Sequence, residues 1–124
     1  MAERYIRVVK NCSANTETTI YTAPNDGASP AGAADSVMIG FFVANTSSTS
    51  GTLTISLTAY YDATVGKLAD TIPLSADTSV DLMPGKMVLQ HGLNNAGTPV
   101  LTGDILKVTA TQPVSVILSM VERV

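Results

Sequence analysis

Alternation of apolar and polar side chains is the clearest regularity in the chain. Between residues 52 and 62, threonine or serine fills nearly every second position, and Leu53, Ile55 and Leu57 lie between them. A period of two residues puts the apolar side chains on one face of an extended segment, so the pattern predicts a half-buried antiparallel strand. Related but shorter or more apolar segments raise the number of expected strands to nine: 5–10, 17–22, 37–44, 52–62, 67–74, 78–82, 86–91, 104–111 and 114–122.

Turn-forming residues separate these segments. Clusters rich in Pro, Gly, Asn and Ser lie between the expected strands, and segment 83–86 predicts a type II turn with Gly85 at positive φ. No window has a helical stripe longer than about two turns. The spacing predicts an all-β fold, namely an antiparallel, jelly-roll-like β-sandwich of eight to nine short strands. We expect one domain over residues 1–124, in which 1–10 is either an N-terminal arm or an edge strand.

Two of the expected strands, 37–44 and 114–122, are apolar on both faces. A two-layer sandwich buries only one face of each sheet, so a second apolar face needs a cover. Loop 23–35 of the same chain is one candidate for that cover. The other is a symmetric oligomer, which would have the following residues at or near the subunit contact: Met38, Phe42, Ile117 and Val121.

Basic residues are concentrated at the N-terminus. Arg4, Arg7 and Lys10 are three of the seven Lys and Arg residues, and none follows before Lys67. The whole chain has a formal net charge of -3, which argues against nucleic acid as a partner. Two interpretations of the basic segment stay open: it contacts an acidic surface of a partner or a neighbouring copy, or its charges protect an edge strand.

Residues suited to catalysis or metal binding are scarce. The single cysteine, Cys12, and the single histidine, His91, allow no intrachain disulfide and no cysteine-based zinc site. We expect no enzymatic activity, no cofactor and no metal. A small enzyme using His91 or Cys12, and loop carboxylates that converge on calcium, are the alternatives. The charged N-terminus and the lack of a long apolar run predict neither an export signal nor a membrane span.

Residues 16–122 resemble a known group of virus proteins. Segment 19–24, Thr-Ile-Tyr-Thr-Ala-Pro, precedes a strand that ends in Asn-Thr-Ser at 45–47. Further along, Leu-Met-Pro-Gly-Lys at 82–86 and Gly-Asp-Ile-Leu-Lys-Val at 103–108 come before the apolar C-terminal strand. This order is similar to that of the small β-sandwich virion proteins of tailed bacteriophages.

The resemblance implies a structural, non-enzymatic role in a phage virion. It implies a capsid cement (decoration) protein that is made in the host cytoplasm and stabilises the outer surface of the head. The major capsid protein would be its partner, and a homotrimer is the favoured assembly. Loop 23–35 and the basic segment with Arg4, Arg7 and Lys10 would make the contacts. A head or tail fibre, a neck or other tail-associated protein, and a receptor- or carbohydrate-binding module are the alternatives.

Overall fold

Strands account for most of the residues that the computed structural model describes, which are 3–24, 35–59, 64–82, 87–90 and 103–123. All nine expected strands are confirmed within these ranges, with ends shifted by a few residues. They are β1 (Glu3–Cys12), β2 (Thr18–Thr22), β3 (Asp35–Asn45), β4 (Gly51–Thr58), β5 (Val65–Leu74), β6 (Ser79–Asp81), β7 (Met87–Gln90), β8 (Ile105–Ala110) and β9 (Val114–Arg123). The described residues include no helix long and apolar enough to cross a membrane.

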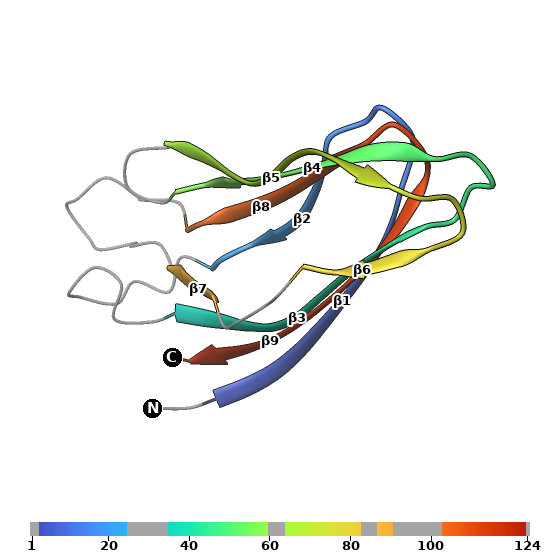
Figure 1. Cartoon of the computed structure of the whole chain (residues 1–124). Helices are drawn as coiled ribbons and strands as arrows, with labels where there is room; N and C mark the ends of the chain where they lie inside the picture. Colours follow the sequence, from blue (N-terminus) through green and yellow to red (C-terminus); the bar gives the residue numbers. More distant parts are fainter. Residues whose placement is uncertain (1–2, 25–34, 60–63, 83–86, 91–102, 124) are drawn as a thin grey trace.

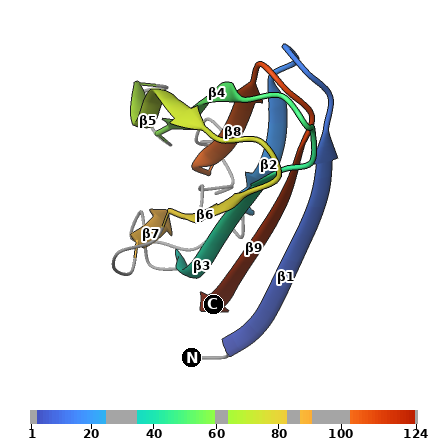
Figure 2. The ribbon, with the colours of Figure 1, turned by 45° about the vertical axis from the view of Figure 1, so that its right-hand side comes forward.

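The strands form two antiparallel sheets that face each other (Figures 1 and 2). The larger sheet has the order β1-β9-β3-β6, with β7 also paired to β3, and the smaller sheet has the order β2-β8-β4-β5. The first strand pairs with the last, β2 with β8, β3 with β6 and β7, and β4 with β5. Because β6 and β7 pair with different halves of β3, they occupy one edge position together. This nested pairing confirms the expected jelly-roll-like sandwich.

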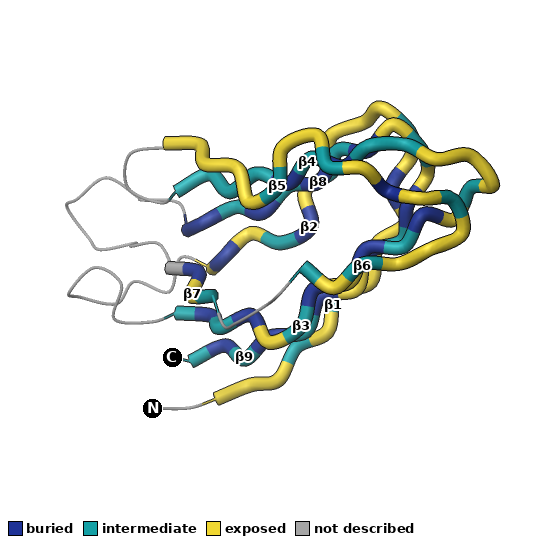
Figure 3. Tube along the Cα trace, viewed as in Figure 1, coloured by how far each residue is buried: buried dark blue, intermediate teal, exposed yellow. Residues whose placement is uncertain are grey.

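The hydrophobic core lies between the two sheets. Phe41 and Leu118 from the larger sheet and Leu53, Ile55 and Leu106 from the smaller one are each at most 1% exposed. Buried residues alternate with more exposed ones along β4, β8 and β9. In Figure 3 this alternation appears as dark blue segments between lighter ones. Burying a side chain of this size contributes roughly 1.5–3 kcal/mol.

A β-bulge interrupts the alternation in β3. The register between β3 and β9 shifts between Met38 and Gly40, which leaves Ile39 as the extra residue. Met38 consequently points into the core and is 0% exposed, whereas Phe42 is 46% exposed on the opposite side. The prediction that Met38 lies with Phe42 at a subunit contact is therefore wrong, because one extra residue reverses the face of every position before it.

Three sequence predictions fall outside the described residues. They concern the type II turn at 83–86, the surroundings of His91, and residues 25–34 of the loop that was expected to cover a sheet or contact a partner.

Candidate functional site

The outer face of the larger sheet, which is the face turned away from the core, exposes an unusual amount of apolar surface. The described residues include eight exposed large hydrophobic side chains, and six of them lie on this face: Tyr5, Val9, Ile39, Phe42, Val88 and Ile117. Together they expose the equivalent of about three whole large side chains, on the order of 500 Å². That is towards the upper end of the largest patches on monomeric proteins, which are often functional.

Strand pairing arranges these side chains in rows. In the first apolar row, Val9 of β1 pairs with Ile117 of β9, and Ile117 pairs with Phe42 of β3. Gly40 of β3 lies beside this row, two residues before Phe42. A Cβ atom at Gly40 would lie 3.6 Å from Cε2 of the Phe42 ring. The aromatic ring therefore leans along the strand over Gly40 and widens the apolar surface.

A second apolar row runs parallel to the first. Tyr5 pairs with Val121, Val121 with Val37, and Val37 with Val88 of β7. Tyr5 is the most exposed large side chain of the group, at 76%. The two rows together extend across all the strands at this end of the sheet.

Polar residues border and divide the two rows. Between them, Arg7 pairs with Ser119. Beyond the second row, Arg123 binds Asp35 through two hydrogen bonds, from Nε to Oδ1 at 2.6 Å and from Nη2 to Oδ2 at 2.5 Å. The hydrogen bonds to Asp35 raise the pKa of Arg123, so the guanidinium stays charged at ordinary pH. An apolar centre with a polar border is the usual layout of a protein interface.

Three of the four apolar residues that the sequence suggested for a subunit contact lie together on this face. Phe42 and Ile117 are paired neighbours, and Val121 lies in the second row. Met38 is in the core, as described above. The sequence reasoning missed Tyr5 and Val9, although the alternation of Glu3, Tyr5, Arg7 and Val9 carried that signal.

The basic residues of the N-terminal segment do not act as one group. Residues 3–12 form β1, which lies at the edge of the larger sheet with its start beside the end of β9 (Figure 1). Arg7 is on the outer face, whereas Arg4 and Lys10 are on the opposite side of the strand, in register with Glu122 and Val116. The three charges therefore cannot meet one partner surface as a single patch.

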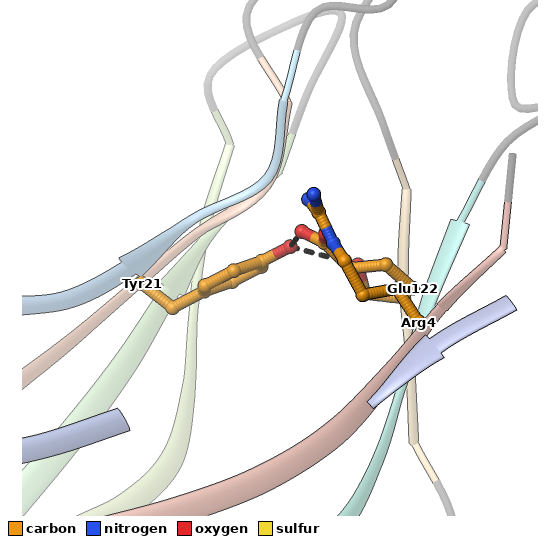
Figure 4. A network of polar contacts seen from close by, with 4 residues as sticks. Arg4, Tyr21 and Glu122 are labelled. Carbon is orange, nitrogen blue, oxygen red and sulfur yellow. Dashed lines mark hydrogen bonds and ion pairs between the residues drawn. The ribbon is translucent and has the colours of Figure 1, made fainter. Parts of the chain in front are cut away.

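A polar network holds β1 and the two sheets together (Figure 4). Glu122 of β9, only 3% exposed, forms an ion pair with Arg4 of β1 and accepts a hydrogen bond of 2.5 Å from the Tyr21 hydroxyl of β2. The same hydroxyl is 2.8 Å from Oγ of Ser36 in β3. Burial, and then the hydrogen bond to Glu122, raise the pKa of the Tyr21 phenol. The network fixes the strand that carries Tyr5 and Val9.

Cys12, the only cysteine, is a buried free thiol at the end of β1. Among the described residues, no group of three or more His, Cys, Asp or Glu side chains could hold a metal ion.

Comparison with known proteins gives a match at the level of fold. No protein-family model and no curated protein matches the sequence. A chain from the structure of infectious bursal disease virus Gx strain matches 97% of this chain with a TM-score of 0.57 and 18% identity. A chain from the T13 viral particle of the same virus, IBDV, also matches 97%, with a TM-score of 0.52 and 17% identity.

The present chain covers 32% and 35% of those two chains, or about a third of their length. At this level of identity the similarity establishes the fold, which is a β-sandwich also found in chains of icosahedral virus particles. The assignment to tailed bacteriophages stays a prediction.

Proposed function

We propose that the chain is a non-enzymatic structural component of a virus particle, and specifically a cement protein on the outer surface of a phage head. The observation that carries the proposal is the fold match, which extends over 97% of this chain and involves chains of an assembled virus particle. The sequence resemblance to small phage virion proteins points in the same direction.

The outer face adds support for a role in assembly. An exposed apolar patch on the order of 500 Å² is typical of a surface that binds another protein. A cement protein acts by binding the assembled head better than its separate subunits, so it stabilises the particle by mass action and without turnover. Such a role needs binding surfaces and no active site.

The first experiment is localisation in purified particles. Mass spectrometry should detect the protein in intact virions, and labelled antibodies should mark the head. Heads that lack the protein should release DNA at a lower temperature than heads that carry it, and adding purified protein should restore the higher temperature. Equal release temperatures, or a label confined to the tail, would refute the cement role. A tail location would support the fibre or neck alternative.

Of the three basic residues of β1, Lys10 is the proposed contact with the major capsid protein, because it lies on the side of the strand opposite the outer face and Arg4 is paired with Glu122. Removing residues 1–10 is a poor test, because it would delete most of an edge strand and break the Arg4 ion pair. Lys10→Glu keeps the strand and reverses one exposed charge. We expect this variant to bind heads more weakly, as wild type should at raised salt. Lys67→Glu, on the smaller sheet, is the matched control, and an equal loss of binding there would refute a specific role for β1.

The resemblance to cement proteins favours a homotrimer, which needs two different surface patches that meet between neighbouring copies. The trimer is the alternative to the two-fold pair described next, and the mass of the protein in solution decides between them.

A further inference from the structure

We infer that the outer face of the larger sheet binds the same face of a second copy of this chain, related by a two-fold axis that runs parallel to the strands between β9 and β3. This inference goes beyond the proposed role in a particle and does not depend on it. It rests on the extent of the apolar face and on the positions of charges around it.

The area is adequate for a stable pair. A standard interface buries about 800 Å² on each partner, and homodimer interfaces are about 65% apolar. The exposed large side chains of this face supply on the order of 500 Å² of apolar surface, close to that share. Two such faces would pack about 10 Å apart, as the sheets of a sandwich do.

Self-pairing about this axis matches most residues of the two apolar rows with apolar residues, and the exception is Val9, which lies over Asp81 of the second copy. The rotation places β9 over β3 of the second copy and β1 over its β6 and β7 edge. Ile117 then lies over Phe42 of the second copy, because these residues are register partners in adjacent strands. In the second row, Tyr5 lies over Val88 of the second copy.

The charges also favour this axis. Arg123 lies over Asp35 of the second copy and Asp35 over its Arg123, so opposite charges meet in both directions. Arg7 lies one row from Asp81 of the second copy. A two-fold axis perpendicular to the strands would superpose the two apolar rows only if it passed through the Arg7 row between them. It would then place Arg7 over Arg7, and like charges at an interface are costly.

Solution mass tests the pairing. Sedimentation of the full chain should give twice the chain mass of 12.9 kDa at micromolar concentration. Ile117→Asp should give a monomer, because the pairing would bury an unpaired charge. Leu68→Asp, a similarly exposed position on β5 of the smaller sheet, should stay dimeric. Tyr5→Asp is the second variant if Ile117→Asp does not fold, since Tyr5 is 76% exposed.

Cysteine cross-linking tests the axis. In a Cys12→Ala background, a bifunctional thiol reagent with a reach of about 10 Å, the spacing of two packed sheets, should rapidly link Tyr5→Cys of one copy to Val88→Cys of the other. The reagent cannot link these two positions within one chain, because they lie three strand spacings apart, about 14 Å. Tyr5→Cys with Val9→Cys, about 13 Å apart along one strand, is the matched control, because it would be linked rapidly only with the perpendicular axis.

A monomeric or trimeric wild type would overturn the inference, as would faster cross-linking of the control pair. Both measurements use purified protein, so they are independent of particle binding. A dimer that fails to bind heads would refute the cement role alone. A monomer that still binds heads would refute the pairing alone.

Discussion

Replacing Tyr21 by phenylalanine tests the polar network that joins the two sheets. The phenol has one hydrogen, and the Glu122 carboxylate only accepts, so Tyr21 donates to Glu122 and Ser36 donates to Tyr21. Tyr21→Phe removes both bonds and leaves the Glu122 side chain, 4% exposed, with one donor fewer. A hydrogen bond to a charged group contributes about 1.5–3 kcal/mol, so we expect a loss of about 2–3 kcal/mol.

Urea unfolding at pH 7 and equal protein concentration measures this loss. With a slope of about 1.5–2 kcal/mol/M, the midpoint should fall by about 1–2 M. Tyr5→Phe is the matched control, because Tyr5 is 76% exposed on the outer face and should change stability by less than about 0.5 kcal/mol. Equal midpoints for the two variants would refute the reasoning.

The raised pKa of Tyr21 adds a pH dependence with a definite sign. The unfolded phenol ionises near its ordinary pKa of 10.0, whereas the folded phenol stays neutral at that pH. The contribution of Tyr21 to the free energy of unfolding is therefore fully present below pH 10 and is lost as the pH rises further. The stability difference between wild type and Tyr21→Phe should shrink above pH 10. A difference that stays constant up to pH 11 would contradict the raised pKa.

Three further substitutions test the packing, each measured by urea or thermal unfolding. Gly103→Ala should cost about 1–3 kcal/mol, because its Cβ would lie 2.3 Å from the backbone oxygen of Ala23, and a cost below about 0.5 kcal/mol would contradict this close approach. Thr71→Gly should stabilise the protein by up to about 1 kcal/mol, because Thr71 has a φ of 54° and a β-branched residue is strained at positive φ. A loss of stability would contradict this strain. Met38→Ala should cost about 2–5 kcal/mol, whereas Val65→Ala, at a position 59% exposed on the smaller sheet, should cost less than about 0.5 kcal/mol. Similar costs would refute the placement of Met38 in the core.

Local alternation was enough to locate the strands. The alternation of threonine and serine with apolar residues predicted β4. The same period of two residues predicted the two faces of β9, on which Ile117 and Val121 lie opposite the buried Leu118. These features depend only on neighbouring residues, because successive side chains of any strand point to opposite faces. The all-β class and the sandwich follow from them.

The candidate site was only partly visible in the sequence. Phe42 and Ile117 were found because each lies in a strand that is apolar on both sides. Met38 was assigned to the wrong face, because a bulge shifts the phase of alternation by one residue, and only the register with β9 reveals it. Tyr5 and Val88 join the site through pairing between strands that are distant in the sequence.

The sequence by itself therefore determined the strands, the all-β class and the surplus of apolar side chains. Tertiary structure alone decided the neighbours: β1 beside β9, the rows of the outer face, and the ion pair between Arg4 and Glu122, which are 118 residues apart. The physical reason is that side-chain alternation is a property of one strand, whereas a sheet face is built by hydrogen bonds between strands. Those bonds bring together residues whose separation along the chain leaves no local pattern.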